Sequence, residues 1–258
     1  MPYSFSADSD RGRRREANED AALAPIAITC GETMSGILAA VADGVGGAVG
    51  GAVASATAIA RFRASFLGAQ NEAPDERLRQ AVQDANAAVH EAGAADAALR
   101  GMATTLVAIV AVDRRIWFAN VGDSRGYLLQ DDDFYQVTTD HSLVADAVHA
   151  GVLTPEEAAR RPERHVITRS LGQSRTVDVD IHGPLRFSPG DIALLCSDGL
   201  HDAVADDAIL RTLRRTPIDG SAMELVRIAN DAGGPDNVTA VVVRSIGDSA
   251  SAPVTGRE

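Results

Sequence analysis

The chain has 258 residues, of which 45% are hydrophobic and 23% charged, and it carries a formal net charge of −12. A chain of this length and composition can bury the core of one large domain, and no linker interrupts it. The acidic balance disfavours a general binder of nucleic acid or of an anionic membrane, because both need a basic surface.

The sequence shows neither a membrane segment nor a secretion signal. No stretch is long and apolar enough for a transmembrane helix, and residues 1–8 lack the basic and apolar regions of a signal peptide. Cys30 and Cys196 each close an apolar run, which is typical of reduced core thiols rather than of a disulfide or a metal pair. These features predict a cytoplasmic protein.

Short β-type runs alternate with helical patterns along the chain. In chain order the patterns predict a strand over 36–42, helices over 48–67 and 75–92, strands over 105–112, 116–121 and 177–182, and strands over 192–196 and 238–243. Two capping-box patterns, Thr154 with Glu157 and Ser221 with Glu224, predict further helix starts. We expect one domain over 1–245 and a disordered tail over 246–258.

Carboxylates recur beside these predicted strands, each next to Gly or Asn or at the end of an apolar run. The five acidic islands are Asn18-Glu19-Asp20, Asp43-Gly44, Gly122-Asp123-Ser124-Arg125, Ser197-Asp198-Gly199 and Asp236-Asn237. Carboxylates that converge without a counter-charge repel one another and raise one another's pKa, so bound divalent metal explains such a set most simply. The six His and two Cys show no zinc-like spacing, and an all-oxygen site selects magnesium or manganese.

Each island also has a plainer interpretation. The segment 15–20 could be a solvated charged loop, and its arginine run could bind phosphate or nucleic acid. Residues 43–47 could form a glycine-rich phosphate cradle, although the Lys-Ser/Thr ending of a P-loop is missing. Residues 122–125 could turn a hairpin between 116–121 and 126–129, Asp198 could cap a helix, and 236–237 could be a turn.

Eight ordered motifs carry a resemblance to a known family. They are Ser9-Asp10-x-Gly12-x-x-Arg15-x-x-Asn18-Glu19-Asp20, Asp43-Gly44-x-Gly46-Gly47, Gly101-Met102-Ala103-Thr104-Thr105, Asn120-Val121-Gly122-Asp123-Ser124-Arg125, Asp140-His141-Ser142, Ile167-Thr168-Arg169-Ser170-Leu171-Gly172, Ser197-Asp198-Gly199-Leu200 and Asp236-Asn237-Val238-Thr239. In order and spacing they resemble the metal-dependent serine/threonine protein phosphatases of the protein phosphatase 2C type, in the compact bacterial form. The resemblance covers residues 4–244.

The resemblance implies an α+β fold, a four-layer α-β-β-α sandwich of two antiparallel sheets flanked by helices, with a flap-like segment over about 140–172. It also implies metal ligands: Asp43 bridging two Mn²⁺ or Mg²⁺ ions, Asp198 and Asp236 completing one site, and Glu19 with the Gly44 carbonyl serving the other. Such a pair generates a bridging hydroxide that attacks phosphorus in line, without a covalent intermediate.

Three further roles follow from the resemblance. Asp20 would contact metal-bound water from a position behind the metal ligands. Arg15 would bind the phosphoryl oxygens in a bidentate manner through its guanidinium group. Asp123, with Asp198, would hold a third and weaker metal ion, which should stay largely hydrated.

The sequence departs from the family in the supply of a proton to the leaving group. Val45 stands where many eukaryotic members carry a histidine proposed as general acid, and valine cannot donate a proton. His141 and His165 are candidates for that role by residue type only. In the flap-like segment Arg161-Pro162 replaces the commoner His-Pro, and Ala103 replaces a usual glycine, which is harmless if its φ is negative.

The expected function is hydrolysis of phosphoserine and phosphothreonine monoesters in proteins, with serine/threonine kinases and their targets as functional partners. We expect a monomer that binds neither nucleic acid nor membrane. Two rival classes remain: a catalytically inactive phosphatase-fold regulator that binds phosphoproteins, and a non-enzymatic binder of nucleic acid or phosphoinositide that uses Arg11 to Arg15.

Overall fold

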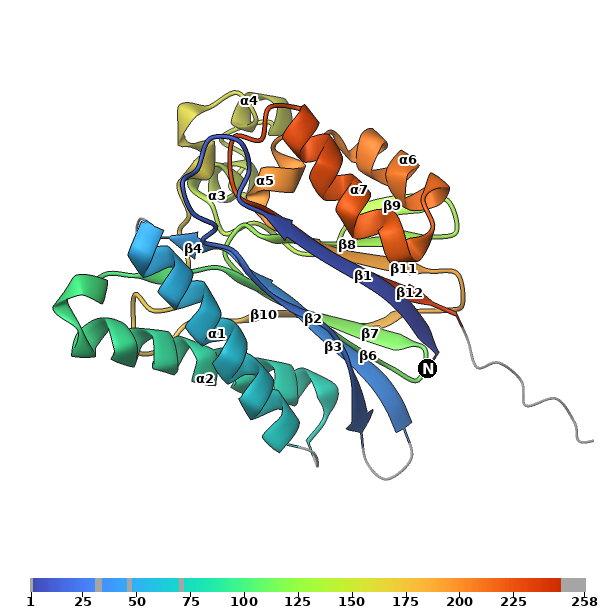
Figure 1. Ribbon diagram of the computed structural model, residues 1–258, viewed down its shortest axis with the longest axis horizontal. Coiled ribbons are helices and arrows are strands. Elements are labelled where there is room, and N and C mark those ends of the chain that lie inside the picture. The colour runs from blue at the N-terminus through green and yellow to red at the C-terminus, as the bar shows by residue number, and fades with distance from the viewer. Residues whose placement is uncertain (1, 31–33, 46–47, 70–71, 247–258) are drawn as a thin grey trace, which may run out of the picture.

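Two five-stranded antiparallel sheets face each other at the centre of the computed structural model, which describes residues 2–30, 34–45, 48–69 and 72–246 (Figure 1). The first sheet has the order β1 (Tyr3–Asp10), β12 (Val238–Ser245), β11 (Ile192–Cys196), β8 (Arg125–Gln130) and β9 (Asp133–Gln136). The second has the order β10 (Asp180–Arg186), β7 (Arg115–Val121), β6 (Leu106–Val112), β3 (Met34–Ala42) and β2 (Ala21–Cys30). A short pair, β4 (Gly44–Val45) and β5 (Ala103–Thr104), lies beside them.

Helices cover the outer face of each sheet. The second sheet packs against α1 (Ala48–Gly68) and α2 (Pro74–Ala95), and the first against α6 (Asp206–Arg215) and α7 (Ile218–Asp231), as the four layers in Figure 1 show. The remaining helices are short: α3 (Leu143–His149), α4 (Pro155–Ala158), α5 (Asp198–His201), and the 3-10 turns Ala97–Leu99 and Pro162–His165. The predicted α+β sandwich is confirmed.

The central strands are apolar on both faces because both faces are covered. In β3, Ile37, Ala39 and Val41 join the core between the sheets, whereas Leu38 and Ala40 join the core under α1 and α2. In β12 the same two-residue alternation sends Val241 and Val243 between the sheets and its other apolar side chains toward α6 and α7. These strands therefore read as continuous apolar runs in the sequence.

The strand register brings the predicted acidic islands to one end of the sandwich. In the second sheet Ala21 pairs with Ala42, so the start of β2, after Glu19 and Asp20, meets the end of β3, before Asp43. In the first sheet Cys196 pairs with Ala240, so the end of β11 meets the start of β12. Antiparallel pairing thus joins acids that are far apart in sequence.

Several predicted boundaries need correction. Ser221 does not cap a helix, because α7 begins at Ile218 and the Ser221 hydroxyl donates back to the carbonyls of Thr216 and Pro217. Residues 122–125 do not turn a hairpin, since β7 and β8 lie in different sheets. The strand predicted over 177–182 starts at Asp180 and runs to Arg186.

Other local predictions are confirmed. Thr154 and Glu157 form the reciprocal capping box at the start of α4. Ala103 is not among the described residues with positive φ. Cys196 is a buried free thiol, whereas the Cys30 side chain lies outside the described part of the structure.

No helix within the described ranges combines the length and the apolarity that crossing a membrane requires. The tail predicted over 246–258 falls, beyond residue 246, outside the described residues.

Candidate metal centre

A cavity of about 520 Å³ opens at the end of the sandwich where the acidic islands meet. Its walls come from the loop before β2, the β3–β4 junction, the β7–β8 crossover, the start of α5, the loop before β12 and the turn after α4. The lining side chains are Arg15, Glu19, Asp43, Gly44, Val45, Thr105, Asp123, Arg164, His165, Ile167, Asp198, Gly199, Asp202, Pro235 and Asp236. Seven of the eight predicted site residues, including every predicted metal ligand, are among these lining residues, and Asp20 is the exception.

Asp43 is held in place by the strand that follows Gly101. Its backbone N–H donates to Thr105 Oγ1 at 2.9 Å, and its carbonyl accepts from the Thr105 N–H at 2.9 Å and from Thr104 Oγ1 at 2.8 Å. Thr105 Oγ1 also lies 2.7 Å from Ser124 Oγ, next to Asp123. One buried threonine therefore fixes the spacing between two carboxylate-bearing segments.

Glycines let Glu19 approach the β3–β4 junction closely. A Cβ on Gly51 would lie 1.9 Å from Glu19 Oε2, and a Cβ on Gly44 would lie 2.2 Å from the Gly51 carbonyl oxygen. The Glu19 carbonyl accepts from the Gly44 N–H at 3.2 Å and from Ser55 Oγ at 2.6 Å. A side chain at Gly51 would displace the Glu19 carboxylate, and one at Gly44 would clash with the backbone of Gly51 and Glu19.

Asn237 organises the loop that carries Arg15 and Glu19. Its Oδ1 accepts from the Glu19 N–H at 2.8 Å, and its Nδ2 donates to the Arg11 and Ala17 carbonyls at 2.9 Å each. Only 4% of the residue is exposed. The sequence placed Asn237 in an acidic island, but its role as the anchor of a loop more than 200 residues away was not predicted.

The carboxylates of the cavity are electrostatically crowded. Desolvation by the surrounding protein, followed by the negative charges of Asp20, Asp198 and Asp123, raises the pKa of Asp43 well above its usual value. Burial also raises the pKa of Asp198, whose carboxyl group lies within hydrogen-bond reach of Asp43. Two such carboxylates cannot both ionise in contact unless positive charge is supplied.

The donor set fits a hard divalent cation. Asp198 Oδ1 is buried and has no hydrogen-bond partner among the described residues. A buried acceptor without a partner costs free energy that a bound cation would offset. Asp43, Asp198, Asp236, Glu19 and the Gly44 carbonyl offer oxygen atoms only, which suits magnesium or manganese.

Asp20 lies behind the cavity rather than in its wall. Its Oδ2 accepts from Ser197 Oγ at 2.7 Å and from Thr239 Oγ1 at 2.6 Å. Burial, together with the charges of Asp198 and Asp236, raises the pKa of Asp20 to about 7, although these two hydroxyl groups lower it. Its Oδ1 has no hydrogen-bond partner within the described structure, so one carboxylate oxygen is left for a water molecule.

Arg15 reaches the cavity through an ion pair with a predicted metal ligand. Its Nη2 donates to Asp236 Oδ2 at 2.6 Å, and the other oxygen of Asp236 accepts from the Asn237 N–H at 2.8 Å. The Arg15 side chain lines the cavity and is 51% exposed.

Asp123 lies beside Asp198, as the resemblance predicts. Burial, and then the charge of Asp198, raises the pKa of Asp123 to about 7. The backbone carbonyl of Asp123 lies 3.2 Å from His201 Nε2, which ties this segment to α5.

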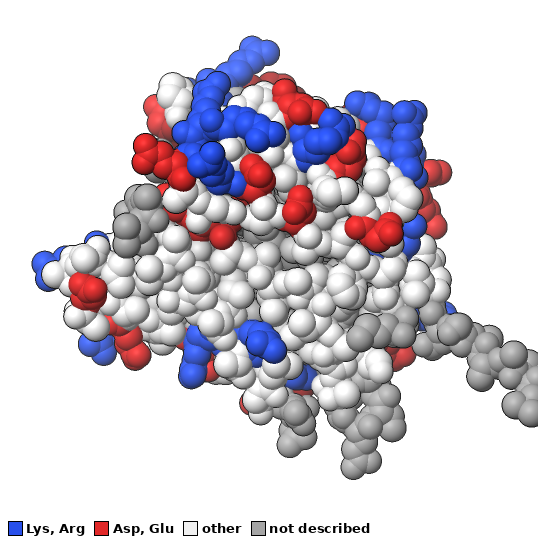
Figure 2. Space-filling view, viewed as in Figure 1, with Lys and Arg blue, Asp and Glu red and all other residues white. Residues whose placement is uncertain are grey.

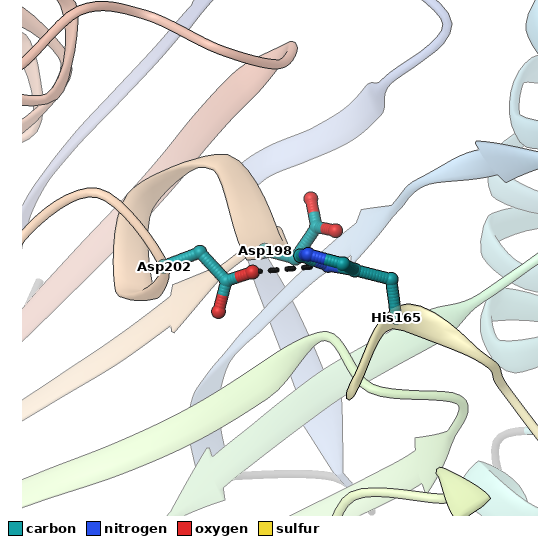
Figure 3. Close-up of side chains that lie close together, drawn as sticks. All are labelled: His165, Asp198 and Asp202. Carbon is teal, nitrogen blue, oxygen red and sulfur yellow. Dashed lines mark ion pairs between the residues drawn. The ribbon is translucent and has the colours of Figure 1, made fainter. Parts of the chain in front are cut away.

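The flap-like segment contributes a histidine and an arginine that sequence reasoning did not place. His165 Nδ1 lies 3.1 Å from Asp202 Oδ2, and potential ligand atoms of His165, Asp198 and Asp202 lie within 4.8 Å of one another (Figure 3). This is the single group of three such side chains at that spacing within the described residues, and it differs from the predicted ligand set. The nearest signal in the sequence was the residue type of His165.

The two histidines considered as proton donors have different positions. His165 lines the cavity, whereas His141 is buried outside it. His141 Nδ1 accepts from the Gly122 N–H at 2.9 Å, and its Nε2 lies 3.1 Å from Asp180 Oδ2. His141 therefore joins the start of the flap to the β7–β8 crossover. Val45 lies at the cavity wall and is 41% exposed.

The fold and the site together define an α+β sandwich with a cavity of crowded carboxylates, suited to a divalent cation, at one end. A family model described as protein phosphatase 2C matches residues 11–233. Serine/threonine protein phosphatase PstP of Mycobacterium tuberculosis is 39% identical over 242 residues, which make up 92% of this chain and 44% of PstP. Protein phosphatase PhpP of Streptococcus pneumoniae is 40% identical over 159 residues, which make up 61% of this chain and 64% of PhpP.

Solved structures agree with the sequence comparisons. The crystal structure of M. tuberculosis PstP superposes with a TM-score of 0.83 at 37% identity, covering 95% of this chain and 99% of that one. The PstP catalytic domain in complex with two manganese ions superposes with a TM-score of 0.80 at 37% identity, covering 94% and 97%. The chain belongs to the protein phosphatase 2C family. It spans less than half the length of the PstP sequence that it matches.

Proposed function

We propose that this protein is a metal-dependent serine/threonine protein phosphatase that hydrolyses phosphoserine and phosphothreonine monoesters. The observation that carries the proposal is the group of desolvated carboxylates in one cavity, with Asp198 Oδ1 lacking a partner among the described residues. The relatives named as serine/threonine phosphatases, one of them solved with two manganese ions, support the same function.

The proposed site would take two Mn²⁺ or Mg²⁺ ions, and Asp43 would serve both of them. Asp198 and Asp236 would serve one ion, and Glu19 with the Gly44 carbonyl would serve the other. When bound, the ions supply an activated water nucleophile and positive charge against the phosphoryl group. A third, weaker ion at Asp123 and Asp198 remains part of the proposal.

The side chains around the metal ligands bind and orient the substrate. Arg15 extends from the Asp236 side and binds two phosphoryl oxygens through its guanidinium. Asp20, fixed by Ser197 and Thr239, accepts a hydrogen bond from water through Oδ1. Leaving-group protonation does not come from Val45, so water or His165 at the cavity wall supplies that proton.

Phosphorylated proteins are the proposed substrates, and the serine/threonine kinases that produce them are the functional partners. A monomeric state, a cytoplasmic location, a single catalytic domain over 1–245 and the absence of nucleic-acid or membrane binding belong to the same proposal. The acidic net charge supports the absence of nucleic-acid and membrane binding, and the free buried thiol of Cys196 supports the cytoplasmic location.

The experiment that tests the proposal is hydrolysis of p-nitrophenyl phosphate and of a phosphothreonine peptide with and without added Mn²⁺. We expect turnover of both substrates that depends on the metal. An inactive phosphoprotein-binding regulator would bind the phosphopeptide without releasing phosphate, but such proteins usually lose metal carboxylates and none is missing here. Binding without turnover would therefore overturn the enzymatic function.

A further inference from the structure

Arg164 lines the acidic cavity without a side-chain hydrogen bond to any described residue. Its nearest carboxylate is that of Asp202, which lies 3.8 Å from Nε, and its side chain is 45% exposed. Arg15, the other arginine of the cavity wall, donates to Asp236 at 2.6 Å. A guanidinium carries five N–H donors, and its terminal fork matches carboxylate or phosphate. The terminal N–H groups of the Arg164 guanidinium are therefore available to bind a ligand.

The turn that carries Arg164 is anchored at the cavity. His165, the next residue, contacts Asp202 at 3.1 Å (Figure 3). Burial alone would raise the pKa of Asp202, but His201, His165 and Arg164 outweigh burial and hold it below its usual value. The contacts of Asp202 with His165 and Arg164 therefore hold the turn Pro162–His165 against α5, with Arg164 at the cavity wall.

Cationic side chains gather around the same opening. Every cation of this chain is an arginine, since the sequence contains no lysine. Exposed arginines near the cavity lie on two segments, the β1–β2 loop (Arg11, Arg13, Arg14 and Arg15) and the flap (Arg160, Arg161 and Arg164). Figure 2 shows basic side chains gathered at the end of the molecule where Figure 1 shows the β1–β2 loop and α4. In a chain of net charge −12, these arginines supply local positive charge for an anionic group.

We infer that Arg164 binds an anionic group next to the phosphorylated residue, so that the enzyme selects substrates with an acidic flank. The inference rests on the proposed phosphatase function. Arg15 and the carboxylate site receive the cleaved phosphoryl group, whereas Arg164 approaches from the flap. A cavity of about 520 Å³ is within the range that encloses a drug-sized ligand, so it has room for a neighbouring side chain. The anion is a carboxylate or a second phosphoryl group.

The test compares four phosphothreonine peptides of one sequence, with Ala, Glu, phosphoserine or Lys beside the phosphothreonine, at saturating Mn²⁺. Phosphothreonine hydrolysis is followed by separating the products. For the wild type we expect kcat/KM to be higher for an acidic flank than for Ala by about two- to fivefold, a factor typical of a half-exposed charged pair, mainly through KM. A preference for Glu identifies a carboxylate, and a preference for phosphoserine alone identifies a second phosphoryl group.

The variant Arg164→Gln should bring the acidic-to-neutral ratio close to one. Arg63→Gln, an exposed arginine of α1 away from the cavity, is the matched control and should keep the wild-type ratio. Arg164→Glu should reverse the preference toward a peptide with Lys at the flank, which separates lost recognition from a disturbed turn. Wild-type activity on all peptides with no flank preference, or a ratio unchanged in Arg164→Gln, would overturn this inference alone. A wild type that hydrolyses no phosphopeptide with Mn²⁺ would overturn the proposed function as well.

Discussion

Replacing Asn237 with alanine should disconnect the metal centre from the loop that carries Glu19. Asn237 accepts one hydrogen bond from the Glu19 N–H and donates two, to the carbonyls of Arg11 and Ala17. Each hydrogen bond contributes about 0.5–1.5 kcal/mol net, so the variant should lose about 2–4 kcal/mol of unfolding free energy. Because water can enter the partly buried side of the loop and replace some of these hydrogen bonds, we expect a loss of unfolding free energy near the lower end of this range.

The larger effect should be on metal binding. Glu19 is a proposed ligand, and losing a partner that orients a metal ligand typically weakens binding by about 10- to 100-fold. We would measure unfolding in urea and the Mn²⁺ affinity by calorimetric titration. The expected result is a clear loss of both for Asn237→Ala.

Asn86 provides a closely matched control. It is also buried, accepts from the Gly172 N–H at 2.9 Å, and donates to the carbonyls of Ser174 and Arg175 at 3.0 and 3.1 Å. Asn86→Ala should therefore lose a similar unfolding free energy but keep its Mn²⁺ affinity. Equal losses of affinity in the two variants, or an unchanged affinity in Asn237→Ala, would refute the role assigned to Asn237.

Four further predictions follow from the site. Asp43→Asn should reduce metal-dependent turnover of p-nitrophenyl phosphate by more than about 100-fold, because losing a residue that only orients a metal ligand already costs about 10- to 100-fold. Activity within a few-fold of wild type would contradict a two-metal centre. Arg15→Ala should raise KM for small phosphoesters without weakening Mn²⁺ binding, and an unchanged KM and kcat would show that Arg15 only belongs to the solvated loop. Val45→His should speed phosphothreonine peptide hydrolysis more than that of p-nitrophenyl phosphate, whose phenolate leaves without a proton, and equal effects would argue against a missing acid. The last prediction concerns chelator-treated protein, in which the folded-state pKa of Asp123, about 7, lies above its unfolded value. The folded state therefore binds more protons than the unfolded state, and the melting temperature should fall as pH rises from about 4 to about 7. Asp123→Asn should flatten that dependence of melting temperature on pH, and an unchanged dependence would contradict the raised pKa.

Strand position decided which parts of the fold could be predicted. Five of the six central strands, β3, β6, β7, β11 and β12, contain apolar runs predicted as strands, whereas β8 was considered only as one arm of a hairpin. Of the four edge strands, β1, β2 and β9 were not predicted and β10 was displaced by three residues at its start. β1 alternates between polar and apolar residues, and β2 contains Pro25 and a register shift between Leu23 and Ile26. Edge strands tolerate proline and polar side chains because one side of the backbone needs no partner.

The side chains that hold the site together were harder to predict than the proposed ligands. Thr105, Ser197 and Asn237 act across 62, 177 and 218 residues of sequence on Asp43, Asp20 and Glu19 respectively. The sequence does not indicate which distant group a hydroxyl or amide side chain will hydrogen-bond. Arg164 was missed for a related reason, since its position depends on how the flap packs against α5.

The proposed ligands were predictable because the fold and the site share one cause. An ionised carboxylate is too costly to bury in an apolar core without a partner, so a buried strand ends where an aspartate follows it. Asp43 follows β3, Asp123 lies two residues beyond β7, and Asp198 lies two residues beyond β11. Antiparallel pairing then carries these strand ends, together with the starts of β2 and β12, to the same end of the two sheets. The apolar runs that build the core therefore also bring the carboxylates together. The interior of the sandwich excludes these charges, but a cation bound at its edge can stabilise them.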